Sequence, residues 1–272
     1  MELKILCPQW GHEHLPVEEF LIKVKNAGYD GVDTWLPEDA RERKHFIRLL
    51  REYELLMVSH QHQARGNSLA AFCRSFEYYL NLSMECDPVL INSHSGRDAF
   101  TPDEQLQVLD TAQEFADRNN VVVAHETHRG RIGFSPGNAA ALFALRPGMK
   151  ITADLSHWVC VTESYLEYFG DTVAEAIRRT EHLHARVGFP EGPQVPDPRS
   201  PFWKVPLDFF LALWGKMIAH QRLSGRKLFT ITTEFGPPPY MWTSVSDHQP
   251  LASQWDINVF MKDLLKKTFV AP

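Results

Sequence analysis

Short apolar runs alternate with amphipathic stretches from one end of the chain to the other. The apolar runs are rich in β-branched residues and are of strand length rather than helix length. Such alternation is typical of repeated βα units around a parallel sheet. We predict eight strands, at residues 3–8, 31–36, 55–60, 88–94, 121–126, 150–155, 181–187 and 228–234.

Helices are predicted between the strands by two kinds of signal. Apolar residues in 17–24 and 257–264 recur at the i, i+3, i+4, i+7 spacing that places them on one helical face. The two stripes are Val17, Phe20, Leu21 and Val24, and Ile257, Phe260, Met261 and Leu264. Residues 101–104, Thr-Pro-Asp-Glu, join an N-cap hydroxyl to the proline and glutamate of a capping box, so a helix starts there. Gly28 suits the left-handed residue that ends the first helix.

Eight βα units fit the 272 residues of the chain, because a closed (β/α)8 barrel takes about 250. We therefore predict the α/β class, with a single (β/α)8 TIM barrel domain over residues 1–272. An open doubly wound sheet would show the same alternation. The even spacing of eight units and the lack of a glycine-rich phosphate loop after the first strand favour the barrel.

Composition narrows the class of partner. The formal net charge is −6 and we find no basic run, so we do not expect binding to nucleic acid. We expect a small molecule as the partner. We find no signal peptide and no apolar stretch of membrane-spanning length, so we expect a cytoplasmic protein without a membrane partner. The four scattered cysteines, none in a C-x-x-C pair, predict reduced thiols.

Two long, proline-rich connections follow the last two predicted strands, at residues 187–206 and 235–250. Loops of this length are uncommon unless they are functional or disordered. Their aromatic residues favour ordered lids over the mouth of the barrel, and a surface loop without function is the alternative.

Candidate chemistry lies at the ends of strands three to eight. Each of these six apolar runs ends in a side chain able to bind a metal: His60, His94, Glu126, Asp154, His184 and Glu234. Polar groups at the C-terminal ends of barrel strands converge on the single site of this fold. Three carboxylates in one buried place require a cation, because unpaired buried charge is costly.

Simpler interpretations of three of these residues stay open. Glu126 could pair with Arg129 or Arg131 instead of a metal. Asp154 could serve as the N-cap of a following helix. His184 competes with His182, which lies two residues away on the same strand face.

With these residues the chain resembles the xylose-isomerase-like TIM barrels, a superfamily of sugar isomerases, epimerases and apurinic endonucleases. The resemblance spans nearly the whole chain and is strongest over strands five to eight. It implies that one divalent metal is held by Glu126, Asp154, His184 and Glu234. It also implies substrate contacts from His157, three residues after Asp154, and from Arg186, two residues after His184.

The chain departs from the endonuclease branch, which builds a three-metal cluster. His60 (or His62), His94 and Asp197 fit that pattern, but Arg199 stands where the cluster has a histidine. The cluster is therefore incomplete. We expect His60 and His94 to bind substrate hydroxyls, with packing at the barrel rim as the alternative.

The implied ligand set is rich in oxygen and favours Mn(II), with Mg(II), Zn(II), Co(II) or Fe(II) possible. We expect a sugar isomerase or epimerase in which proton abstraction α to a carbonyl gives a metal-stabilised enediolate. Glu126 and Glu234 are expected to lie on opposite sides of the substrate carbon and to exchange its proton. Five tryptophans near strand ends could stack on a sugar; they are Trp10, Trp35, Trp158, Trp203 and Trp242.

Other functions remain open at this point. The same barrel supports a metal-dependent hydrolase of the endonuclease-IV kind, a lyase such as an inosose dehydratase, or a sugar-binding protein without catalysis. The sequence does not identify the sugar, whether it carries a phosphate, or whether the chain forms a homo-oligomer.

Overall fold

The computed structural model describes residues 1–270, in which eight parallel strands close into one barrel in sequence order. The strands are β1 (Glu2–Pro8), β2 (Gly31–Thr34), β3 (Leu56–Gln61), β4 (Ile91–Ser93), β5 (Val123–Glu126), β6 (Ile151–Ala153), β7 (Thr180–Ala185) and β8 (Leu228–Thr233). The predicted α/β class and (β/α)8 barrel are confirmed. Closure depends on the pairing of β1 with β8, which runs from Glu2 opposite Leu228 to Leu6 opposite Thr232.

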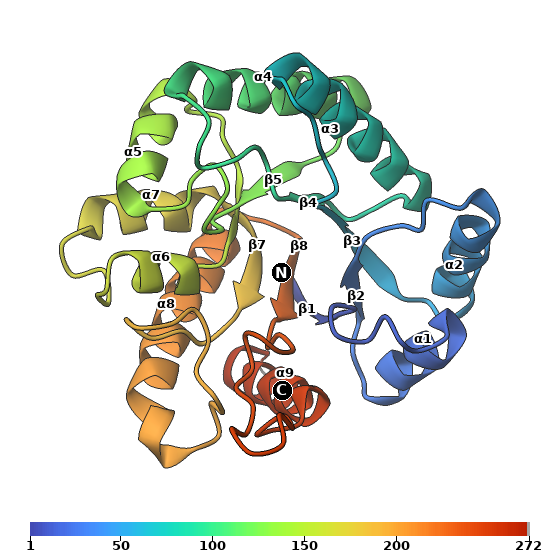
Figure 1. Cartoon of the computed structure of the whole chain (residues 1–272), viewed down its shortest axis with the longest axis vertical. Helices are drawn as coiled ribbons and strands as arrows, with labels where there is room; N and C mark the ends of the chain where they lie inside the picture. The colour runs from blue at the N-terminus through green and yellow to red at the C-terminus, as the bar shows by residue number, and fades with distance from the viewer. Residues whose placement is uncertain (271–272) are drawn as a thin grey trace.

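Helices surround the strands as a ring (Figure 1). They are α1 (Val17–Asn26), α2 (Ala40–Glu52), α3 (Leu69–Ser83), η1 (Met84–Cys86), α4 (Pro102–Asn119), α5 (Pro136–Leu145), α6 (Ser156–Val161), α7 (Gly170–Arg179), η2 (Pro201–Trp203), α8 (Lys204–Leu223) and α9 (Gln254–Phe269). Here α6 and the 3-10 helices η1 and η2 are short additions to the eight-fold βα repeat.

The predicted helix signals have the expected structural roles. Phe20, Leu21 and Val24 are the buried residues of α1. At the start of α4, the Thr101 hydroxyl accepts from the Glu104 backbone and the Glu104 carboxylate accepts from the Thr101 backbone, which confirms the capping box. Gly28 follows α1 with a φ of +75°, the left-handed conformation that glycine adopts without strain.

Apolar side chains pack on both sides of the barrel wall. The main core lies between strands and helices and includes the fully buried Trp158 and Trp214. Leu6, Val58 and Ala124 contact one another although they lie on the non-adjacent strands β1, β3 and β5, so they fill the barrel interior.

All eight strands run in one direction, so the loops after them gather at one end of the barrel, its mouth. The long loop after β7 reaches the one after β8 through Gln194. Its amide nitrogen donates to the Gly236 carbonyl at 3.1 Å, and its oxygen accepts from the Gly236 N–H at 2.7 Å. The two long loops are therefore joined at the mouth.

Within residues 1–270, no helix has the length and apolar character needed to cross a membrane. The four cysteines, Cys7, Cys73, Cys86 and Cys160, are free thiols, as their spacing predicted.

Candidate functional site

Four side chains from consecutive strands meet at the mouth of the barrel. Glu126 ends β5, Asp154 follows β6, His184 lies near the end of β7, and Glu234 follows β8. One potential ligand atom from each lies within 4.8 Å of the others, and all four residues are buried. The structure thus brings together the four residues that the sequence singled out as a ligand set.

Glu126 is held by polar groups from neighbouring strands. Its Oε2 accepts from Nδ2 of Asn92 at 2.9 Å and lies 3.0 Å from Nε2 of His94, while its Oε1 has no hydrogen-bond partner in the described chain. Burial alone would raise the pKa of Glu126, but His94 and His184 lower it well below its usual value. The alternative pairing with Arg129 or Arg131 is wrong, because among residues 1–270 only histidine side chains, and no arginine, lie within 4.0 Å of the Glu126 carboxylate as basic partners.

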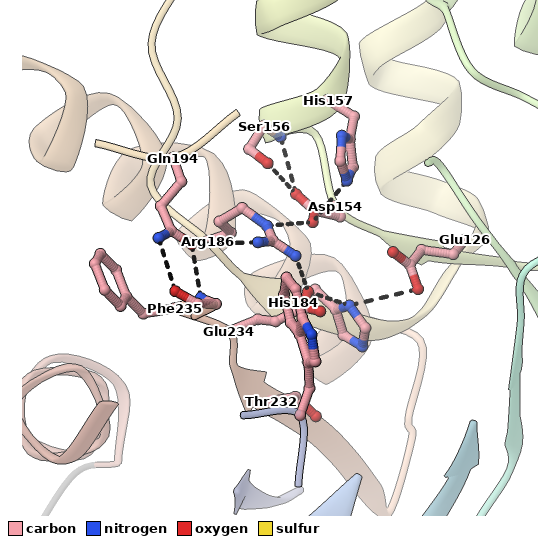
Figure 2. Close-up of polar contacts among 12 residues, drawn as sticks. Glu126, Asp154, Ser156, His157, His184, Arg186, Gln194, Thr232, Glu234 and Phe235 are labelled. Atoms are coloured by element: carbon pink, nitrogen blue, oxygen red, sulfur yellow. Dashed lines mark hydrogen bonds and ion pairs between the residues drawn. The ribbon is translucent and has the colours of Figure 1, made fainter. Parts of the chain in front are cut away.

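Asp154 divides its two oxygens between structure and site, as Figure 2 shows. Oδ1 accepts from the backbone and hydroxyl of Ser156 at 3.1 and 2.5 Å, in the first turn of α6. Oδ2 accepts from Nε of Arg186 at 2.9 Å. Burial raises the pKa of Asp154 to about 6, which Arg186 opposes and Glu234 reinforces. The N-cap interpretation of Asp154 is wrong, because Leu155 is the N-cap of α6; Oδ1 still accepts from the first residue of that helix, and Oδ2 faces the site.

Asp33, on β2, determines which nitrogen of His184 faces the site. Its Oδ2 lies 2.9 Å from Nε2 of His184, and an ionised carboxylate only accepts, so this nitrogen donates. His182 lies one layer deeper, where Nε2 is 3.2 Å from the same oxygen and Nδ1 is 2.7 Å from the Thr230 hydroxyl. The competition between the two histidines is thus resolved by depth, and Nδ1 of His184 points to Glu234.

Arg186 lies between two of the carboxylates (Figure 2). Its Nε donates to Asp154, and its Nη2 lies 2.9 Å from Oε2 of Glu234. Only 2% of the Arg186 side chain is exposed, so its charge compensates these carboxylates directly. Burial alone would raise the pKa of Glu234, but Arg186 and His184 lower it.

The donor set fits a divalent cation. The buried carboxylates of Asp33, Glu126, Asp154 and Glu234 face one buried guanidinium and His184, whose pKa the carboxylates raise despite burial, so negative charge remains in excess. Nδ1 of His184 lies 2.5 Å from Oε2 of Glu234 without the alignment of a hydrogen bond, and neither it nor Oε1 of Glu126 has a hydrogen-bond partner among residues 1–270. Oxygen and nitrogen ligands bind such ions at about 2.0–2.2 Å, so small shifts would place all four ligand atoms around one ion.

A second group of possible ligands shares Glu126. His60, His94 and Glu126 offer atoms within 4.8 Å of one another. The loop after β7 adds nothing to it, because Asp197 is engaged by Arg199, whose Nη2 lies 2.7 Å from its Oδ2. The residue at which the chain departs from the three-metal pattern is thus Arg199, which forms an ion pair with Asp197.

A cavity of about 280 Å³ opens beside these groups, slightly smaller than typical small-molecule pockets. Most of the predicted substrate-contacting residues line it: Trp10, Trp35, His60, His94 and Arg186. Glu234 also lines it, whereas Glu126 does not. The cavity therefore lies against the Glu234 side of the cluster.

His157, which we expected to contact the substrate, does not line the cavity. It is fully buried, and its Nε2 is 3.5 Å from Oδ2 of Asp154. Its ring packs 4.1 Å from that of His128, centroid to centroid. Burial lowers the pKa of His157 well below its ordinary value, so the ring is neutral. The structure brings it to the cluster but behind the cavity wall.

The five tryptophans do not form one surface. Trp10 and Trp35 line the cavity, whereas Trp158 is fully buried and donates to the Gly133 carbonyl at 2.8 Å. Trp203 packs on Phe189, and Trp242 is 48% exposed. The expected cluster of five is thus wrong, because helix α6 and the long loops take the other three away from the cavity.

Sequence reasoning missed several residues of the site. Asp33 lies within the predicted strand 31–36, and a lone carboxylate in that apolar run was a usable signal. Tyr240, which lines the cavity, had no such signal, because it lies in a long loop. Its ring centroid is 4.8 Å from the Arg186 guanidinium and 5.1 Å from Trp10. Tyr240 confirms that the loop after β8 covers part of the mouth.

A protein-family model matches more than half of the chain. The family model described as xylose isomerase-like TIM barrel matches residues 21–196. No significant match came from curated protein sequences.

Solved structures share the barrel at low sequence identity. A D-tagatose 3-epimerase-like protein superposes with a TM-score of 0.64 at 13% identity, covering 98% of this chain and 97% of its own. A probable 3-DHS dehydratase of petrobactin synthesis from Bacillus anthracis gives 0.62 at 14% identity, covering 97% and 99%. Endonuclease IV from Thermus thermophilus gives 0.57 at 12% identity, covering 98% and 99%. At these identities the likeness establishes the fold alone.

Proposed function

The chain belongs to the xylose isomerase-like TIM barrel family, and on that premise we propose that it is a divalent-metal-dependent sugar isomerase or epimerase. The observation that carries this proposal is the cluster of Glu126, Asp154, His184 and Glu234, whose buried charge and unpartnered atoms suit a cation. Epimerases among the structural neighbours support it further. Mn(II) is the favoured ion for this donor set.

Four residues at the mouth would bind the ion, and two further residues would position them. Glu126, Asp154, His184 and Glu234 hold the ion, and Asp33 keeps His184 in the tautomer with a free Nδ1. Arg186 orients the carboxylates of Asp154 and Glu234. When bound, the ion supplies Lewis-acid stabilisation of negative charge on adjacent sugar oxygens.

The proton transfers are assigned to the two glutamates. The pKa values of Glu126 and Glu234 are both lowered despite burial, by His94 and His184 for Glu126 and by Arg186 and His184 for Glu234, so both are ionised near neutral pH and able to accept a proton. Glu234, at the cavity wall, removes the proton from the carbon beside the sugar carbonyl. For epimerisation, Glu126 first takes up a proton from water and donates it to the opposite face, while Glu234 keeps the proton that it removed and releases it to water. Return of the abstracted proton by Glu234 to the neighbouring carbon gives isomerisation.

The cavity residues hold the sugar. Trp10 and Trp35 offer flat rings for its C–H faces, while His60 and His94 bind hydroxyls. His157 supports the cluster from behind by packing on His128.

Deuterium incorporation at the α carbon, measured by NMR in D2O across a panel of ketoses, aldoses and cyclitols, tests the proposal. The metal content of the purified protein is measured alongside. We expect about one ion per chain, and loss of at least about 100-fold in exchange for Glu234→Gln. Glu175→Gln, which removes a carboxylate on α7, is the control and should exchange normally. Absence of exchange with every sugar would overturn the proposal.

One observation favours a second candidate, a metal-dependent hydrolase. The His60, His94 and Glu126 group offers a second ion a place beside the first, and two ions about 3.5–4 Å apart are typical of phosphodiester cleavage. Two ions per chain together with cleavage of a model phosphodiester would favour the hydrolase over the isomerase.

A further inference from the structure

Three neighbouring loops at the mouth carry an unusual concentration of arginine. Strands β3, β4 and β5 are adjacent in the barrel, and the loops that follow them are residues 62–68, 94–101 and 127–135. Asp98 is their only acidic residue, although the whole chain has 34 acidic residues and a net charge of −6. We call their four arginines the basic rim: Arg65, Arg97, Arg129 and Arg131.

Three of these guanidinium groups are fixed to the backbone by one nitrogen. Nη1 of Arg65 donates to the carbonyls of His62 and Ala64, at 2.9 Å each. Nη1 of Arg97 and of Arg131 both donate to the Gly96 carbonyl, at 3.1 and 3.5 Å. Each arginine is thus held in place while its other N–H groups stay available.

The arginines of the basic rim form no salt bridge within residues 1–270. Among residues 1–270, no carboxylate lies within 4.0 Å of any of its four side chains, whereas nine arginines elsewhere have such a partner. Burial lowers the pKa of Arg97 and Arg65 lowers it further, whereas Asp98, which forms no salt bridge with Arg97, opposes this only in part. Like charges held together in this way favour an external anion.

The basic rim adjoins the cavity. Each of its loops also supplies a histidine to the cavity wall: His62, His94 and His128. The Arg129 guanidinium lies 5.1 Å from the ring centroid of Tyr240, another residue of that wall. A molecule held by the rim at one end can therefore place its other end in the cavity.

We propose that the basic rim binds an anionic group of the substrate, a phosphate or a carboxylate, while the reacting part of the molecule occupies the cavity. Guanidinium groups bind both anions through paired hydrogen bonds. Arg186 is the one arginine or lysine among the residues that line the cavity, and Asp154 and Glu234 already engage it. This inference rests on the proposed function in taking the cavity as the place of reaction, and it specifies an acidic or phosphorylated sugar derivative.

Binding of inorganic phosphate and of acetate, measured by isothermal titration calorimetry, tests the rim without any assumption about turnover. The proteins are wild type, Arg97→Gln, the double variant Arg97→Gln/Arg131→Gln, and Arg97→Lys. We expect the double variant to bind the preferred anion at least about tenfold more weakly, and Arg97→Lys to fall between it and wild type. The matched control is Arg51→Gln, an exposed arginine in the last turn of α2, which should bind as wild type does.

The same titrations on metal-free and metal-loaded protein separate the rim from the metal centre. Anion binding that persists without metal and needs Arg97 supports the rim. Anion binding that is lost when the metal is removed, or that the double variant retains in full, overturns the rim proposal. Stronger binding of single-stranded DNA than of a sugar phosphate, lost in the double variant, would also overturn it in favour of a nucleic-acid surface.

Failure of this inference differs from failure of the proposed function. If anion binding depends on the basic rim but no sugar exchanges a proton, the rim proposal stands and the isomerase proposal is wrong. If neutral sugars exchange their proton equally fast in wild type and the double variant, the isomerase proposal stands and the rim proposal is wrong.

Discussion

Nε2 of His184 donates a hydrogen bond to Oδ2 of Asp33 across the barrel mouth, at 2.9 Å. The Thr232 hydroxyl donates to the same oxygen, also at 2.9 Å. Neighbouring groups lower the pKa of Asp33 below its usual range, against the effect of burial, so it remains an acceptor at any physiological pH. Carboxylates placed behind a ligating histidine in this way fix its tautomer and strengthen it as a ligand.

Replacement of Asp33 by Asn should therefore weaken metal binding by about 10- to 100-fold, because the acceptor that fixes His184 loses its charge. Competition with a fluorescent chelator measures the affinity. Thr232→Val is the matched control, since it removes one bond to Asp33 but keeps the carboxylate, and its loss should be smaller. Histidine nitrogen chemical shifts report the tautomer directly, and an unchanged tautomer with unchanged affinity would remove this role from Asp33.

Arg186 should matter most in the absence of metal. Its replacement by Met leaves Asp154 and Glu234 without their buried guanidinium. Breaking a buried ion pair costs about 3–5 kcal/mol, so the free energy of unfolding of the metal-free protein should fall by about that amount. Urea unfolding with and without Mn(II) measures this. The variant should gain more stability from the ion than wild type does, and an equal gain would contradict the prediction.

Gln194 should control the order of the loop after β8. Its side chain satisfies both backbone groups of Gly236 and lies 3.3 Å from Nη1 of Arg186. Gln194→Ala leaves these buried groups unpaired, at a cost of about 1–3 kcal/mol each. We expect faster amide hydrogen exchange over residues 236–250, measured by mass spectrometry. Exchange in α4, on the other side of the barrel, serves as the internal control, and protection unchanged in both regions would show that other contacts hold the loop.

The strands were predictable because burial on both faces leaves a plain apolar signal. All eight predicted runs overlap an observed strand, yet the run 88–94 contains only Ile91–Ser93 as strand. Apolar residues beyond the ladder, such as Leu90, are needed for packing inside the barrel as well as for the strand. An apolar run therefore locates a strand better than it defines its ends.

The ligand set was predictable for a different reason. In a barrel the end of every strand faces one mouth, so position along the chain fixes the meeting of Glu126, Asp154, His184 and Glu234. Tyr240 and Gln194 lie in long loops, where no periodicity relates sequence to position. Asp33 could be assigned to the site only if the direction of its side chain was known, because its partner His184 lies on a strand that is not a neighbour of β2.

His12 should make the fold less stable in mild acid. Burial lowers the pKa of His12 to about 4, and Lys23 and His14 add to this effect. In the unfolded chain the group titrates near its ordinary value of about 6.5. Between these two pH values the unfolded chain binds a proton that the folded chain does not. The stability contributed by neutral His12 is therefore present above about pH 6.5 and is lost as the pH falls toward about 4.

The size of the effect follows from proton linkage. One extra proton on the unfolded chain gives a slope of at most about 1.4 kcal/mol per pH unit. Urea unfolding of wild type and His12→Gln at several pH values measures the slope, which should be shallower in the variant. The matched control is the exposed His14→Gln, which keeps His12 and its burial, the largest cause of the shift, so its slope should stay well above that of His12→Gln. Parallel curves for wild type and His12→Gln would mean that His12 takes up its proton equally in both states, contrary to its burial against Phe20 and Trp255.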